Sequence, residues 1–144
     1  MIPNDFLKPL SILVGTWQTV GTHPLVPGVT LHGTVIFEWI EGGAYLKMSS
    51  EIDDSRFPSG IAVIGSDNES KQIFMLYFDE RNVSRKHEFS IDATEWKWWR
   101  SHPGFSQRYT VKFEDNGNTM VGKGELCTDG STWESDLDLT YKRV

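Results

Sequence analysis

A repeated pattern of short alternating segments, separated by turn residues, constrains this chain most strongly. Between residues 16 and 143 apolar and polar side chains alternate with a period of two, which is the period of a half-buried β-strand. Asn116-Gly117 and Asp129-Gly130 stand between such segments, and these dipeptides are the strongest short-range indicators of a β-hairpin. The pattern therefore predicts an antiparallel all-β fold.

The alternating segments predict about ten strands, and their short connections favour a closed up-and-down β-barrel over a Greek-key sandwich. A meander of this length closes because closure removes exposed sheet edges. A helix is predicted only over Asn4–Leu13, with Asn4 as its cap and Pro9 limiting it to a short or 3₁₀-like piece. The predicted strands are Thr16–Thr22, Thr30–Ile40, Ala44–Ile52, Ile61–Ser66, Gln72–Asp79, Val83–Ile91, Glu95–Arg100, Phe105–Glu114, Thr119–Cys127 and Thr132–Arg143.

Length, charge and cysteine content exclude several classes of protein. The 144 residues are predicted to form one domain, residues 1–144. A net charge of −6 argues against nucleic acid as a partner, and Cys127 as the only cysteine excludes an intrachain disulfide. No signal peptide is evident, and no apolar run approaches the roughly 20 residues of a membrane span. We therefore expect a cytoplasmic protein without a membrane span.

Alternation also indicates which side chains face the barrel interior. On Thr30–Ile40 the more apolar face carries Val35, Phe37 and Trp39, and on Val83–Ile91 the inner face carries Arg85, His87 and Phe89. For Gln72–Asp79 both faces are apolar, so its direction stays open. The last strand alternates between Ser135, Leu137, Leu139 and Tyr141 on one face and Glu134, Asp136, Asp138 and Lys142 on the other.

These inward residues predict a site for a small hydrophobic ligand with an anionic or polar head. A buried arginine needs a partner, and its planar guanidinium suits a carboxylate. Alternation also turns Tyr109 inward on Phe105–Glu114, and Trp98 shares a face with Trp96 and Arg100 on Glu95–Arg100. Arg85, His87 and Tyr109 would orient the head, and Trp39, Phe89 and Trp98 would hold the body. The alternative is a barrel filled by its own side chains, which would act through its outer surface or as a homodimer.

Five motifs follow one another along nearly the whole chain: Leu13-Val14-Gly15-Thr16-Trp17, Glu41-Gly42-Gly43-Ala44-Tyr45, Ile64-Gly65-Ser66-Asp67, Trp133 and Tyr141-Lys142-Arg143. In their order and spacing they resemble the motifs of the calycin barrels, which include lipocalins and fatty-acid-binding proteins. In detail the sequence is more similar to small bacterial lipocalin-like proteins of unknown function. Nitrobindin-like haem barrels share the opening Gly-x-Trp and the ten-strand plan more distantly.

The resemblance implies a structural plug at one end of the barrel. As in lipocalins, a late arginine, here Arg143, would stack on the indole of Trp17, so that a ligand enters at the opposite mouth. The haem-binding relatives use a late histidine, whereas residues 103–144 contain none. Haem would therefore require His87 or His102 in a different geometry, and we predict no cofactor.

Catalysis is the weaker alternative to binding. Calycin-like barrels occasionally carry out isomerisation or cyclisation in the cavity, and His87 with Tyr109 or Glu38 could supply an acid–base pair. No such pair stands at a fixed spacing in the sequence. The four histidines are not at metal-ligand spacing, so no metal site is predicted.

Overall fold

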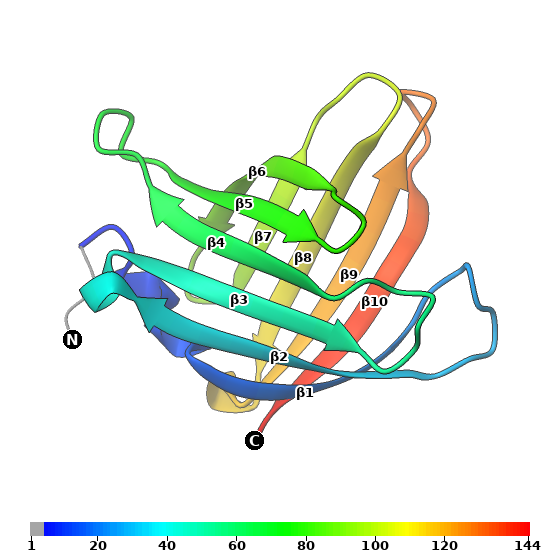
Figure 1. Ribbon diagram of the computed structural model, residues 1–144, viewed down its shortest axis with the longest axis horizontal. Coiled ribbons are helices and arrows are strands. Elements are labelled where there is room, and N and C mark those ends of the chain that lie inside the picture. The colour runs from blue at the N-terminus through cyan, green and yellow to red at the C-terminus, as the bar shows by residue number, and fades with distance from the viewer. Residues whose placement is uncertain (1–4) are drawn as a thin grey trace.

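Ten antiparallel strands close into a barrel in the computed structural model, which describes residues 5–144 (Figure 1). Each strand pairs with its neighbours in sequence, and β1 pairs with β10 to close the sheet, which confirms the predicted fold class. The strands are β1 (Gly15–Thr22), β2 (Leu31–Ile40), β3 (Tyr45–Ile52), β4 (Gly60–Ser66), β5 (Ile73–Asp79), β6 (Ser84–Ile91), β7 (Glu95–Arg100), β8 (Ser106–Glu114), β9 (Thr119–Cys127) and β10 (Glu134–Arg143).

The predicted strands agree with the observed ones to within two residues at each end. The strand bounds agree because the turn residues that separate the strands can be recognised in the sequence. Asn116 and Gly117 both have positive φ angles, of 52° and 84°, in the turn η3 (Asp115–Gly117) between β8 and β9. Glu41–Gly43, the residues left between the predicted strands Thr30–Ile40 and Ala44–Ile52, likewise form the short 3₁₀ element η2 between β2 and β3.

The predicted N-terminal helix is shorter than Asn4–Leu13. It is a 3₁₀ helix, η1 (Lys8–Leu13), which has a proline in its first turn and no side-chain cap. Asn4, the predicted cap, lies outside the described residues. Leu10 and Leu13 are buried, so η1 packs its apolar side onto the barrel.

Inward and outward faces follow the predicted alternation on most strands. Val35 and Phe37 on β2 and His87 and Phe89 on β6 are buried. For β5 the structure shows which face points into the barrel, which the sequence left open. Met75 is buried inside the barrel, whereas Phe78 is 43% exposed on its outer surface.

A β-bulge on β10 corrects one predicted face. Strict alternation placed Asp136 on the same side as Glu134 and Asp138, but the pairing of β10 with β9 shifts register between Ser135 and Asp138. The extra residue re-aims the strand locally. As a result the neighbours Asp136 and Leu137 both contribute to the inner wall.

The core fills the end of the barrel that η1 closes. Trp17 is fully buried there, and its indole Nε1 donates a hydrogen bond to the Leu13 carbonyl oxygen at 2.8 Å. Arg143 lies over the same indole, with 4.2 Å between its guanidinium carbon and the ring centroid. Further buried side chains at this end include Leu7, Phe37, Leu46, Trp96, Val111 and Met120.

Gly15 permits this closed end. Its φ of +133° is rarely adopted by other residues, and a β-carbon there would lie 3.0 Å from Arg143 Nη1. Arg143 in turn donates hydrogen bonds to the carbonyl oxygens of Val14 at 2.7 Å and Ile12 at 2.6 Å. The stacked pair implied by the lipocalin resemblance is thus present, together with a backbone clamp on the end of η1.

Candidate ligand cavity in the open half of the barrel

The opposite half of the barrel contains a cavity of about 430 Å³. β6 and β8 run from this mouth toward the closed end of the barrel. Their first inward-facing residues, Arg85 and Gln107, therefore lie near the mouth. Farther in, Met75, Trp98, Leu139 and Tyr141 form the wall. A volume of this size is within the range of small-molecule sites.

The structure brings together four of the six residues predicted to bind a ligand. Arg85, His87, Trp98 and Tyr109 line the cavity. Phe89 and Trp39 are not part of its lining. Phe89 is buried below the cavity floor against Trp96, with 5.8 Å between ring centroids, and Trp39 packs against the core one residue from the end of β2.

Aromatic rings form a continuous ladder along one wall of the cavity. The His87 imidazole stacks on Trp98 at 4.2 Å between centroids with an interplanar angle of 12°. On its other side Tyr77 lies nearly parallel at 6.0 Å, and Tyr109 follows Trp98 at 5.8 Å. Because these side chains come from β5 to β8, the ladder runs across four adjacent strands.

His87 is a buried imidazole whose ring nitrogens have no hydrogen-bond partner among residues 5–144. Only 3% of the residue is exposed, and both Nδ1 and Nε2 are unpartnered within this range. Burial lowers the pKa of His87 to about 4, and the positive charges of Arg100 and Arg85 act in the same direction. At neutral pH the ring is therefore uncharged.

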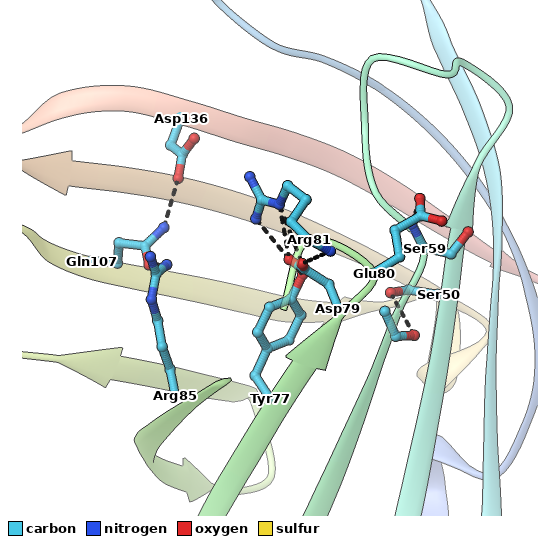
Figure 2. A network of polar contacts seen from close by, with 10 residues as sticks. Ser50, Ser59, Tyr77, Asp79, Glu80, Arg81, Arg85, Gln107 and Asp136 are labelled. Atoms are coloured by element: carbon cyan, nitrogen blue, oxygen red, sulfur yellow. Dashed lines mark hydrogen bonds and ion pairs between the residues drawn. The ribbon is translucent and has the colours of Figure 1, made fainter. Parts of the chain in front are cut away.

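Arg85 is a cation at the cavity mouth that has no carboxylate partner. Its Nη1 donates a hydrogen bond to Gln107 Oε1 at 3.3 Å, and the two side chains lie side by side in Figure 2. Its guanidinium also lies over the Phe105 ring at 5.1 Å. Among residues 5–144, no ion pair involves Arg85. Arg100 lies over the same ring at 5.9 Å, so two guanidinium groups converge there.

Arg81, also at this mouth, differs from Arg85 because Asp79 neutralises it. Arg81 Nη2 lies 2.7 Å from Asp79 Oδ2, and the same oxygen accepts a hydrogen bond from the Tyr77 hydroxyl at 2.7 Å (Figure 2). The Arg81 hydrogen bond holds the pKa of Asp79 well below its usual value. Burial raises the pKa of Tyr77 above its usual value, so Tyr77 stays protonated.

A pair of tyrosine hydroxyls lies deeper in the cavity. The hydroxyl oxygens of Tyr109 on β8 and Tyr141 on β10 are 2.7 Å apart, and both residues are buried. Thr19 on β1, which pairs with Tyr141 across the sheet, adds a third hydroxyl to the same wall. Polar groups therefore occur both at the mouth and in the interior.

His23 and Asp136 at the rim were not predicted as site residues. His23 Nε2 lies 2.9 Å from Asp136 Oδ1, and the His23 Nδ1 accepts a hydrogen bond from the Leu25 amide at 3.0 Å. Gln107 Nε2 donates to Asp136 Oδ2 at 3.4 Å, which connects this pair to Arg85. The bulge that turns Asp136 inward has no clear sequence signal. Tyr141, by contrast, is on the alternating face that Leu139 shares.

The histidines do not fit the haem alternative. An iron ligand needs an accessible ring nitrogen that faces the cavity. Both nitrogens of His87 are covered, and both nitrogens of His23 are engaged in hydrogen bonds. His32 and His102 are exposed and lie outside the cavity lining. The described chain also has no group of three or more His, Cys, Asp or Glu side chains placed to hold a metal ion.

The acid–base pairs considered for catalysis are not assembled. Glu38 points outward, as its position on the polar face of β2 requires, and its carboxylate pairs with Lys47 Nζ at 3.0 Å. The pairing of His87 with Glu38 is therefore wrong. His87 and Tyr109 share the cavity, but the indole of Trp98 stacks on both rings and separates them.

Comparison with known proteins shows the fold and not a family. No protein-family model matches the chain, and no curated protein matches it. Among solved structures, the chain is similar to the crystal structure of Rv2717c from M. tuberculosis, with a TM-score of 0.71, 11% sequence identity and 99% coverage of both chains. Over residues 5–144, no helix is long and apolar enough to cross a membrane.

Proposed function

We propose that the cavity binds a small amphipathic carboxylic acid, with the carboxylate on Arg85 and the apolar body in the interior. One observation carries the proposal: Arg85 lines the cavity and has no carboxylate partner within the described chain. The barrel fold and the Arg143–Trp17 contact also support a calycin-like carrier.

The charge arrangement at the mouth favours an anion. A partly buried guanidinium without a counter-ion is costly, and a carboxylate that accepts two of its N–H groups offsets that cost. Arg100, near Arg85, has its pKa lowered by burial and by the neighbouring positive charge. An incoming carboxylate would relieve this repulsion. Arg81 contributes little because Asp79 already neutralises it.

The interior favours an apolar body of limited size. A cavity of about 430 Å³ holds on the order of 14 water-sized groups, which is close to the size of a twelve-carbon acid. Hydrophobic burial of such a chain supplies most of the binding free energy. The apolar wall consists of Val35, Met48, Met75, Trp98, Leu126, Leu137 and Leu139.

The test compares dodecanoate with 1-dodecanol by isothermal titration calorimetry on three proteins: the native protein, Arg85→Gln and Lys86→Gln. Lys86 is the matched control because it is the next residue on β6 and points outward over the Phe74 ring. Hydrogen bonds to a charged group contribute about 1.5–3 kcal/mol. We therefore expect Arg85→Gln to weaken dodecanoate binding by roughly 10- to 100-fold, and Lys86→Gln to leave it unchanged.

The alcohol separates the charge effect from a loss of fold. Dodecanol binding should be weaker than that of dodecanoate in the native protein and insensitive to Arg85→Gln. Equal affinities for acid and alcohol, or an absence of dodecanoate binding, would refute the proposed function.

A further inference from the structure

The Tyr109–Tyr141 pair holds one more proton than its internal hydrogen bond uses. Two neutral hydroxyls carry two protons, and a single hydrogen bond of 2.7 Å joins their oxygens. Within residues 5–144 neither hydroxyl makes another hydrogen bond. One O–H donor is therefore left over, and both residues are part of the cavity wall.

Glycines on β9 hold this pair in place. A β-carbon at Gly122 would overlap the Tyr109 hydroxyl, and one at Gly124 would lie 3.2 Å from Tyr109 Cδ1. The ring therefore lies flat against the backbone of β9. Its hydroxyl is fixed beside Tyr141 instead of turning freely toward water. A donor fixed in this way is preorganised for a partner.

The pair remains protonated at physiological pH. Burial raises the pKa of Tyr109 well above its ordinary value, and burial also raises the pKa of Tyr141. Asp138 and Asp136 add negative charge near Tyr109, which further disfavours a phenolate. The wall thus offers an O–H group, and the complementary group on a ligand is an oxygen acceptor.

Tyr109 lies deeper than the acid-binding position. Gln107, which holds Arg85, and Tyr109 are two residues apart on the same face of β8. At about 3.3 Å per residue, this separation is roughly 7 Å along the wall. An acceptor on the ligand must therefore be several bonds away from its carboxylate.

We propose that the acid bound by this cavity carries a second oxygen function, a ketone or hydroxyl in the middle of its chain, that accepts a hydrogen bond from the Tyr109–Tyr141 pair. This inference rests on the proposed function, because the carboxylate at Arg85 sets where the second oxygen lies. The ligand class is thus an oxygenated medium-chain acid, distinct from a plain fatty acid.

The test measures dissociation constants of 6-oxododecanoate and dodecanoate with the native protein and with Tyr109→Phe, Tyr141→Phe, the double variant and Arg85→Gln. Tyr45→Phe is the matched control, since it removes a hydroxyl from the half-buried Tyr45 of β3, which is not part of the cavity lining. In the native protein and in Tyr45→Phe we expect the oxo acid to bind about three- to tenfold more tightly than dodecanoate. This preference should disappear in the double variant.

A spectroscopic measurement keeps the test independent of stability changes. The infrared carbonyl stretch of bound, ¹³C-labelled 6-oxododecanoate should lie at a lower frequency in the native protein than in the double variant, because only the native pair donates a hydrogen bond to the ketone. In Arg85→Gln both acids should bind more weakly while the preference for the oxo acid persists.

Each contrary outcome addresses one of the two proposals. Equal affinities of the native protein for the two acids, with binding still sensitive to Arg85→Gln, would overturn the inference and leave the proposed function in place. If neither acid binds, the proposed function itself fails, and the inference fails with it.

Discussion

At the scale of single residues, His87 is the least expected feature of the barrel. Buried polar atoms are normally hydrogen-bonded, because an unsatisfied one costs about 1–3 kcal/mol. In the part of the chain that the structure describes, both ring nitrogens of His87 lack a hydrogen-bond partner, and the ring stacks on Trp98 and Tyr77. The residue therefore behaves as a flat neutral spacer in the aromatic ladder and reduces the stability of the fold.

Replacing His87 by phenylalanine should change how stability depends on pH. In the folded protein His87 is neutral down to a pKa of about 4, whereas an unfolded imidazole takes up a proton below its ordinary value of 6.5. The unfolded state binds more protons between these values, so the free energy of unfolding falls as the pH falls through this window. From the 2.5-unit difference between the two values, the loss is on the order of 3 kcal/mol.

The measurement is urea unfolding of both proteins between pH 7 and pH 4. His87→Phe should be at least as stable as the native protein at pH 7 and should lose less stability on acidification. Carboxylates common to both proteins, such as Asp79, contribute equally to the two curves. Parallel curves would mean that the pKa of His87 is not lowered by folding, and would contradict the buried, uncharged imidazole.

At the scale of elements, η1 is attached to the barrel by the packing of Leu10 and Leu13 and by hydrogen bonds from one arginine. The Arg143 guanidinium donates to the carbonyl oxygens of Ile12 and Val14 and also to that of Gly117 at 3.3 Å. It thereby links η1, the start of β1 and the turn η3. Its stacking on Trp17 adds a cation–π contact of about 0.5–2 kcal/mol.

Arg143→Met should therefore destabilise the closed end. Loss of the charge-assisted hydrogen bonds and of the stacking predicts a decrease of about 2–4 kcal/mol in the free energy of unfolding. For a chain of this length, that corresponds to a fall in Tm of roughly 5–15 °C. Lys142→Met, at the exposed neighbouring position, is the control and should change Tm by little. A drop in Lys142→Met equal to that in Arg143→Met would contradict the clamp.

Sequence patterns predict the strands well because the bounds of a strand depend on residues that are close together in the sequence. Turn residues and two-residue alternation set the strand bounds and show that Arg85, His87 and Tyr109 face inward. Alternation does not give height along the barrel axis, and so Trp39 and Phe89 were grouped with residues that lie nearer the mouth. The height of a residue along the barrel axis follows instead from the number of residues that separate it from the nearest turn. Trp39 comes just before the turn at Glu41–Gly43, at the same end as Trp17.

Contacts between distant strands were beyond the reach of local patterns. The Tyr109–Tyr141 pair depends on the register of β8, β9 and β10, and the inward turn of Asp136 depends on a bulge in that register. Register is fixed by the packing of the whole sheet. The polar part of the candidate site was therefore only half predictable, although its aromatic wall followed from alternation.

At the scale of the whole molecule, the barrel is divided into a filled half and a hollow half. Large side chains such as Trp17, Phe37 and Trp96 are fully buried at the closed end, whereas the open half leaves about 430 Å³ unfilled. Empty volume lined by apolar groups forgoes packing energy. A fold selected only for stability would fill this space. If the proposed ligand binds here, binding and stability place opposite demands on this half of the barrel.

Met48→Phe tests this division directly. Met48 faces the cavity from β3, between Phe37 and Ala62 across the sheet, so a phenyl ring there would occupy part of the hollow. Cavity-filling substitutions commonly add about 0.5–2 kcal/mol of stability and reduce function. We expect the free energy of unfolding to stay constant or to rise, and the affinity for dodecanoate to fall by roughly tenfold or more.

Met48→Leu is the matched control, because it nearly conserves volume and should preserve both stability and binding. The two measurements are urea unfolding and calorimetric titration with dodecanoate. If Met48→Phe lowered stability and left dodecanoate binding intact, the space would be closed in solution and the ligand would bind elsewhere on the barrel. If instead Met48→Phe keeps the free energy of unfolding and loses affinity for dodecanoate, the cavity serves ligand binding, because leaving it empty does not stabilise the fold.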